Sequence, residues 1–131
     1  MAQEVGDCDW RASSQVIAEP WEANTRSFAN GEIRLTIMDA GEPAAGSYFL
    51  MILSPPYGDA GRQCAMLALD ADGMGFASLS MDGAKADYDP ASGLSVTLAA
   101  TGWLRDADTY QDATLSVTIN QETGAITGAL D

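Results

Sequence analysis

The sequence predicts an all-β protein: a single domain, residues 1–131, of about eight or nine antiparallel strands arranged as a β-sandwich or a partly closed barrel. Three observations lead to this prediction. Apolar and polar residues alternate with period two in several segments, turn-forming residues separate those segments, and no apolar stripe with helical spacing exceeds two turns. A length of 131 residues is also enough for one hydrophobic core without a structural metal.

The first part of the chain, residues 1–24, lacks clear alternation, and we expect an irregular stretch, a short helix or an edge segment there. Next comes the dipeptide Asn30-Gly31, which is favoured in two-residue hairpin turns because both central residues need positive φ. Residues 33–37 then alternate apolar and polar side chains, so we expect a strand with one buried and one wet face.

The middle of the chain predicts the innermost strand. Gly46–Ser54 is apolar on both faces, as expected for a central strand that is covered on each side. The segment that follows, Ser54–Arg62, contains Pro55-Pro56 and predicts a long loop. Gln63–Leu69 and Met74–Met81 are expected to form the next pair of strands, joined by a turn at Asp70–Gly73.

Two further hairpins are expected near the end of the chain. Residues 94–98 and 115–119 show the strict alternation of half-buried strands. The turn Asp89–Gly93 offers Asp at the entry, Pro with its fixed φ and Gly at the left-handed exit, and Asn120–Gly124 repeats this logic before a last strand at 126–130.

The charge balance excludes several classes of function. Six Lys and Arg stand against 19 Asp and Glu, and there is no His, so the formal net charge is −13. Nucleic acids and anionic membrane surfaces carry the same sign and should repel the chain. The longest apolar run, Tyr48–Leu53, is far too short to cross a bilayer, so no membrane insertion is expected. Without histidine, catalytic mechanisms that need an imidazole are excluded. The expected partner is an unidentified protein or small-molecule ligand.

Cys8 and Cys64 stand far apart, without a C-x-x-C motif, and predict either two unreactive thiols or one disulfide. Ala2-Gln3-Glu4 after Met1 looks like the start of a processed chain, so we expect a signal peptide to have been removed. The protein is then periplasmic or secreted, and in that oxidising compartment Cys8 and Cys64 should be joined.

Aspartates are the most abundant reactive groups, and two clusters are candidates for a Ca²⁺ site. They are Asp70 with Asp72, and Asp106 with Asp108 and Asp112. Ca²⁺ prefers six to eight oxygen ligands, which loop carboxylates can supply, but neither cluster has the distal Glu of an EF-hand loop. Solvated turns without a metal are the alternative interpretation, and no other cofactor is expected.

The candidate ligand-binding residues are Pro55, Pro56, Tyr57 and Arg62, because binding residues concentrate on loops and these lie in the expected loop. No nucleophile elbow, P-loop or dinucleotide motif is present, so no catalytic residue is assigned. Paired carboxylates leave a small hydrolase as an alternative. The composition therefore favours a non-enzymatic, exported binding module, with a Ca²⁺-binding β protein as a further alternative.

Three short motifs carry a resemblance. With Cys8-Asp9-Trp10, Gly61–Cys64 and Tyr88–Leu94, the chain resembles small exported proteins of uncharacterised function from alphaproteobacteria, which implies export but no activity. As an acidic β protein with one expected disulfide, it is also similar to the periplasmic inhibitors of lysozyme and of secreted proteases. That resemblance implies inhibition of a basic hydrolase, which a net charge of −13 would attract.

Overall fold

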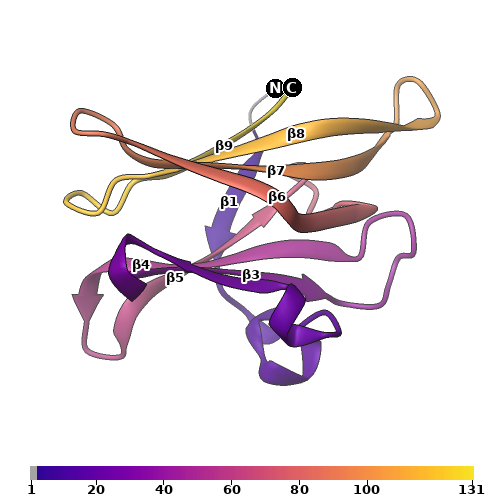
Figure 1. The fold of residues 1–131 in the computed structure, drawn as a ribbon. Coiled ribbons are helices and arrows are strands. Elements are labelled where there is room, and N and C mark those ends of the chain that lie inside the picture. Colours follow the sequence, from indigo (N-terminus) through magenta and orange to yellow (C-terminus); the bar gives the residue numbers. More distant parts are fainter. Residues whose placement is uncertain (1–2) are drawn as a thin grey trace.

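The computed structural model describes residues 3–131, which form two antiparallel β-sheets packed face to face (Figure 1). The nine strands are β1 (Glu4–Asp7), β2 (Thr25–Phe28), β3 (Ile33–Asp39), β4 (Tyr48–Gly58), β5 (Gly61–Ala68), β6 (Ser78–Asp89), β7 (Gly93–Leu104), β8 (Thr109–Ile119) and β9 (Ile126–Leu130). The first sheet has the order β1-β5-β4-β3-β2 and the second β6-β7-β8-β9. The predicted all-β fold is confirmed, as a sandwich that does not close into a barrel. The expected processed start at Met1 and Ala2 lies outside the described residues.

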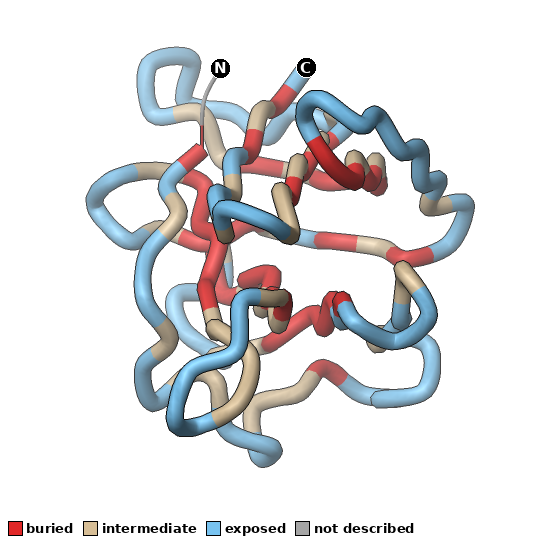
Figure 2. The backbone as a smooth tube through the Cα atoms, turned by 90° about the vertical axis from the view of Figure 1, so that its left-hand side faces the viewer, coloured by how far each residue is buried: buried red, intermediate tan, exposed pale blue. Residues whose placement is uncertain are grey.

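The main core fills the space between the two sheets, where Figure 2 shows the buried residues gathered. Its fully or almost fully buried side chains include Ile33, Leu35, Ile37, Leu50, Ile52, Leu67, Phe76, Val96, Leu98, Leu115, Val117 and Ile119. They come from the alternating segments of the sequence, because side chains two apart on a strand point to the same face. Each such aliphatic or aromatic side chain contributes about 1.5–3 kcal/mol when it leaves water.

The first sheet is buried on both faces, as the apolar sequence of its central strand predicts. β4 lies in the middle of this sheet, between β3 and β5. Its outward-facing Phe49 joins Met38 of β3 and Met66 of β5 in a second, smaller core. The N-terminal segment covers this second core, with Val16 and Ile17 packed against it. The sandwich is therefore extended by a third, irregular layer.

That third layer consists of short 3-10 helices and not of an α-helix. They are η1 (Trp10–Ala12), η2 (Ser14–Val16) and η3 (Trp21–Ala23). The only edge strand before residue 24 in the described chain is β1, which pairs with β5. The backbone of Ala18 joins this layer to β3, because its N–H donates to the Ile37 carbonyl at 3.0 Å.

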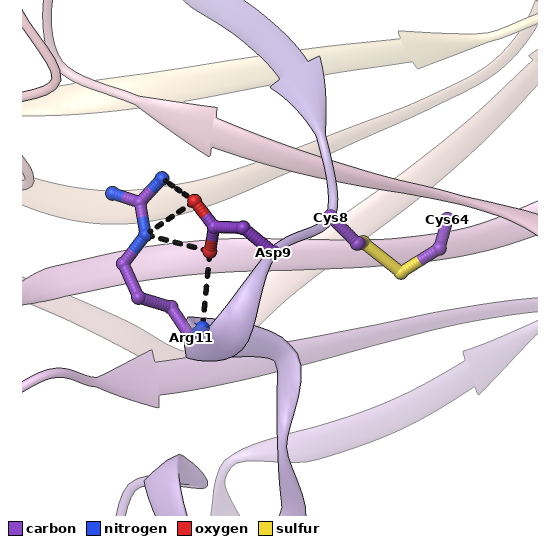
Figure 3. The surroundings of a disulfide bond; sticks show 4 residues. All are labelled: Cys8, Asp9, Arg11 and Cys64. Atoms are coloured by element: carbon purple, nitrogen blue, oxygen red, sulfur yellow. Dashed lines mark hydrogen bonds and ion pairs between the residues drawn. A yellow bond between two sulfur atoms is a disulfide. The ribbon is translucent and has the colours of Figure 1, made fainter.

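A disulfide between Cys8 and Cys64 attaches the N-terminal layer to β5, as predicted (Figure 3). The Cα atoms of the two residues are 5.6 Å apart. The carboxylate of Asp9, next in the chain, accepts from the backbone N–H of Arg11 at 3.0 Å and from the Arg11 guanidinium at 2.7 Å. These hydrogen bonds lower the pKa of Asp9. The guanidinium carbon also lies 4.3 Å from the centre of the Phe49 ring, so the segment is held against the second core at two points.

The prediction of a two-residue turn at Asn30-Gly31 is wrong. Phe28 pairs with Ile33, so the connection spans residues 29–32 and contains the 3-10 helix η4 (Ala29–Gly31). Ala29 and Asn30 have φ values of 54° and 57°, and the left-handed conformation therefore begins one residue earlier than the dipeptide suggests. Such a conformation is costly for alanine and needs support from its surroundings.

The expected loop Ser54–Arg62 is also wrong, because the two strands continue through it. β4 extends to Gly58 and β5 starts at Gly61, so only a tight turn separates them. The ladder is interrupted by a bulge between Ser54 and Tyr57, and pairing resumes with Tyr57 opposite Arg62. Pro55 and Pro56 occupy the bulge, where a strand tolerates residues that cannot donate to the ladder.

The expected pairing of Gln63–Leu69 with Met74–Met81 is likewise wrong, because the two segments belong to different sheets. The Asp70–Gly73 turn forms as predicted and is closed by the Leu69 N–H, which donates to the Met74 carbonyl at 2.8 Å. The chain then crosses over, and β6 begins at Ser78. Along the way, Phe76 forms an isolated antiparallel β-bridge with Tyr48 of the first sheet. Side-chain alternation does not show which sheet a strand joins, so it could not reveal this crossover.

The last two predicted hairpins are present. The Asp89 carboxylate accepts from the Ala91 N–H at 2.8 Å at the β6–β7 turn, and Gly93 has a φ of 106°. At the β8–β9 turn, the Asn120 side chain accepts from the N–H of Glu122 at 3.0 Å. Aspartate and asparagine thus act at the turn entries, as their side-chain geometry predicts.

Candidate functional site

A cleft of about 640 Å³ lies beside the far end of the β7–β8 hairpin. One wall is the core-facing side of that hairpin, with Leu104, Gln111 and Ala113. The opposite wall is the β5–β6 connection, with Leu69 and Ala71. β7 and β8 have twelve and eleven residues, whereas β5 has eight, so the longer hairpin leaves part of its inner face open here.

Gly102 brings the two walls together. A Cβ atom at this position would lie 2.9 Å from Cδ1 of Leu69, a distance that real Cβ contacts do not show. Glycine therefore lets the connection approach β7 without displacing the Leu69 side chain. A glycine inside a strand is a known sign of such an approach, and it was the available signal for this cleft in the sequence.

An aromatic pair fixes the outer face of the same hairpin. Trp103 and Tyr110 are cross-strand partners whose rings are 4.9 Å apart and meet edge to face at 68°. Such pairs contribute about 0.5–1.5 kcal/mol beyond the burial of their area. Trp103 also contributes to the wall of the cleft, while Tyr110 is half-exposed. Beside them, the Thr101 hydroxyl donates to the Asp112 carboxylate at 2.8 Å.

Arg105 stands at the edge of the cleft and joins its two walls electrostatically. Its guanidinium donates to Oδ2 of Asp72 at 2.9 Å and lies 3.7 Å from Oδ2 of Asp70. The other oxygen of Asp70 accepts from the N–H groups of Asp72 and Met74, at 3.0 and 3.1 Å. These ion pairs are exposed and contribute little stability, but they hold Arg105 in place across the two sheets.

The structure separates the second predicted acidic cluster. Asp106 lines the cleft, Asp108 occupies the β7–β8 turn with a φ of 52°, and Asp112 pairs opposite Thr101 on the other face of the hairpin. In the first cluster, Asp70 and Asp72 share Arg105. Within residues 3–131, no group of three or more acidic or cysteine side chains is arranged to hold a metal ion.

The predicted ligand-binding residues Tyr57 and Arg62 meet at the other end of the first sheet. The Tyr57 hydroxyl donates to Oε2 of Glu32 at 3.0 Å, and this hydrogen bond to a carboxylate raises the pKa of Tyr57. Arg62 donates to the carbonyl oxygens of Gly31 and Glu32 at 2.8 and 3.2 Å. These contacts support the left-handed connection before β3. A shallow hollow of about 470 Å³ lies between Gly31, Leu53, Tyr57 and Arg62.

The other two predicted ligand-binding residues, Pro55 and Pro56, contact neighbouring parts of the fold. Pro56 packs at Gly124, where its Cδ atom lies 2.8 Å from the position of a Cβ at that glycine. The Gln63 amide donates to the Gly124 carbonyl at 2.7 Å and, less closely, to the Pro55 carbonyl at 3.3 Å. The bulge therefore connects the first sheet to the β8–β9 turn of the second. Of the four predicted ligand-binding residues, Tyr57 and Arg62 border the hollow.

Glu32 and Arg105 were not among the residues that the sequence singled out. Glu32 precedes a strand and Arg105 follows one, and neither belongs to a motif. Their partners are 25 and 33 residues away, respectively, and come close only through the sheet register and the crossover.

Comparison of the chain with protein-family models, with curated proteins and with solved structures finds no match. In the part of the chain that the structure describes, no helix is long and apolar enough to cross a membrane.

Proposed function

We propose that the protein is a non-enzymatic binding module of an exported compartment, and that its ligand lies in the cleft beside Arg105. The observation that carries this proposal is the cleft itself, whose lining combines apolar residues such as Leu69 and Leu104 with several charged ones. Its volume of about 640 Å³ falls within the range of small-molecule sites, which are typically lined by apolar residues with a few polar ones that orient the ligand.

The charges around the cleft favour a ligand with an apolar body and a positive group. Carboxylates of Glu4, Asp70, Asp106 and Asp131 line it, against the single guanidinium of Arg105. That guanidinium is already engaged with the carboxylates of the β5–β6 turn. An anionic ligand would therefore meet uncompensated negative charge, whereas a cation would reduce it.

Export and the lack of catalysis have separate support. Disulfides such as Cys8–Cys64 persist in oxidising compartments and are rare in the cytosol, which favours a periplasmic or secreted location. The chain contains no histidine, and the disulfide uses both cysteines, so nucleophile and base pairs of those types are excluded.

A charge series of one molecular shape tests the ligand class. We would titrate the protein with benzamidine, benzamide and benzoate, which are cationic, neutral and anionic at neutral pH, and follow backbone amide signals by NMR. The expected affinities are weak, with Kd of about 1 mM, and decrease from benzamidine to benzoate. The shifted signals should include those of Leu69, Ala71 and Leu104.

Two tryptophan substitutions at exposed turn alanines provide the matched variants. Ala107 lines the cleft, whereas Ala91 lies in the β6–β7 turn, away from it. Ala107→Trp should abolish benzamidine binding and Ala91→Trp should leave it unchanged. The proposal is wrong if no member of the series shifts the cleft signals, or if both variants bind benzamidine as the wild type does.

Inhibition of a basic hydrolase is a second candidate, and the β4–β5 hairpin favours it. Residues 56–60 at its end are exposed, as expected of a contact loop, and the net charge of −13 would attract a basic enzyme. We would measure the activity of lysozyme and of a panel of secreted proteases with added protein. Full activity at micromolar protein would exclude this candidate, and saturable inhibition that Tyr57→Ala weakens would support it.

A further inference from the structure

β6 lies at the open edge of the second sheet (Figure 1). One side of it pairs with β7, and no other strand among residues 3–131 pairs with its opposite side. Residues 82–89 are exposed except for the half-buried Ala84. The Ala84 carbonyl accepts a long hydrogen bond of 3.5 Å from Arg26 of β2, and the regular pairing with β7 resumes at Lys85. A free strand edge of this kind presents backbone N–H and C=O groups to any strand that can reach it.

The core-facing side of this edge is uncovered as well. Ala86 pairs with Val96, and Tyr88 pairs with Leu94. Val96 and Leu94 are buried in the core, so Ala86 and Tyr88 occupy core-facing positions on their strand. Both are nevertheless exposed, Tyr88 by 62%. The second sheet thus extends beyond the first here and leaves an aromatic and an alanine side chain without cover.

Charged residues usually prevent two strand edges from pairing, and this edge carries the only lysine of the chain, Lys85. The charges of Lys85-Ala86-Asp87 are, however, complementary to those of a second, antiparallel copy of the same segment. If two copies pair antiparallel about a two-fold axis through Ala86, each Lys85 stands opposite an Asp87. In the same register, the two exposed Ala86 residues meet on the axis, and Tyr88 stands opposite Ala84, which is half-buried against the main core.

We infer that a second copy of this chain adds its β6 to this edge, in the antiparallel register that places Ala86 on the two-fold axis. Two four-stranded sheets then form one continuous sheet across an isologous interface. The interface uses the part of β6 that pairs with the start of β7, whereas the cleft lies at the far end of β7. The inference is therefore independent of the proposed function.

Charge reversal tests this register directly. We would measure self-association by sedimentation equilibrium at an ionic strength of about 0.15 M, where a Debye length of about 8 Å screens the long-range repulsion between two acidic copies. Lys85→Asp and Asp87→Lys each replace two attractive cross-strand contacts by two repulsive ones. We expect each to weaken the dimer about tenfold to a hundredfold. The double variant Lys85→Asp/Asp87→Lys restores both contacts and should restore the wild-type affinity.

Asp82→Lys is the matched control for net charge. Like Asp87→Lys, it makes the chain less acidic by two charges, but in the inferred register residue 82 faces no charged residue. If only net charge governed association, Asp82→Lys and Asp87→Lys would strengthen it equally. The inference requires Asp87→Lys to weaken the dimer while Asp82→Lys does not.

A second measurement uses a cysteine on the axis. Two copies of Ala86→Cys have Cα atoms about 4.5–5.5 Å apart in this register, a separation that a disulfide spans. Oxidation should link Ala86→Cys into dimers rapidly, whereas Asp82→Cys should remain monomeric. The inference is overturned if the wild type is a monomer at about 1 mM, or if the double charge variant is as weak as the single ones. It is also overturned if the two cysteine variants cross-link at the same rate.

Discussion

The disulfide should contribute a large share of the protein's stability, because it limits the conformations open to the unfolded chain. Cys8 and Cys64 are 56 positions apart, so their bond closes a loop of about 57 residues in the unfolded chain. On the loop-entropy relation, opening that loop costs about 4 kcal/mol of unfolding free energy at room temperature. With an unfolding entropy of about 2.1 cal/mol/K per residue, the loss for 131 residues corresponds to a melting temperature about 15 °C lower.

The variant Cys8→Ala/Cys64→Ala tests this magnitude, because alanine introduces no buried polar group. We would compare it with the wild type by guanidinium unfolding and by calorimetry. The m-value should rise in the variant, since the open unfolded chain exposes more surface. A loss of less than about 1 kcal/mol with an unchanged m-value would refute the reasoning, because the disulfide would then constrain neither state appreciably.

Three further outcomes are expected. Gly93→Ala should destabilise the protein by about 2–3 kcal/mol in urea unfolding, because φ is 106° and the new Cβ would meet the backbone of β8; Gly58→Ala, in open space, should change stability by less than about 1 kcal/mol. The hydrogen bond to Glu32 raises the pKa of Tyr57 in the folded protein. The stabilisation from this hydrogen bond is therefore complete below the unfolded-state pKa near 10 and is lost as pH rises through the folded-state pKa. Glu32→Gln should therefore lower the pKa of Tyr57 in an absorbance titration, and an unchanged pKa would contradict the assignment. Millimolar Ca²⁺ should leave the melting temperature unchanged, because both carboxylates of the β5–β6 turn already pair with Arg105, and a rise of several degrees would restore the calcium hypothesis.

The sequence predicted those parts of the fold that depend on local patterns. The alternation at residues 33–37, 94–98 and 115–119 identified strands, because burial on one face imposes period two. The apolar run Gly46–Ser54 identified the central strand, since a strand covered on both faces has no polar side. The turn at Asp89–Gly93 was predictable because its geometry restricts the residue types at each position.

Long-range geometry could not be predicted in this way. Pro55 and Pro56 indicate a break in hydrogen bonding, but a loop and a bulge satisfy that requirement equally. The alternation in Met74–Met81 is the same whether the strand pairs with its predecessor or crosses to the other sheet. The cleft depends on this crossover, because it brings Asp70 to Arg105. Two residues from the predicted binding loop, Tyr57 and Arg62, do meet, but their partners Gly31 and Glu32 lie on a connection whose shape the sequence concealed.

The acidity of the chain acquires a more specific meaning from the contacts of its aspartates. Asp39, Asp70 and Asp89 each accept a backbone N–H two residues ahead, at 2.8–3.0 Å, so these carboxylates shape turns. Turn-forming aspartates gather at the ends of a sandwich, where clefts also open. A β-sandwich with such turns therefore surrounds its end clefts with negative charge even before any ligand is considered. Arg105 offsets part of that charge at one cleft, and the remaining carboxylates favour a cation there. The benzamidine series therefore tests whether the carboxylates around the cleft also select the charge of the ligand.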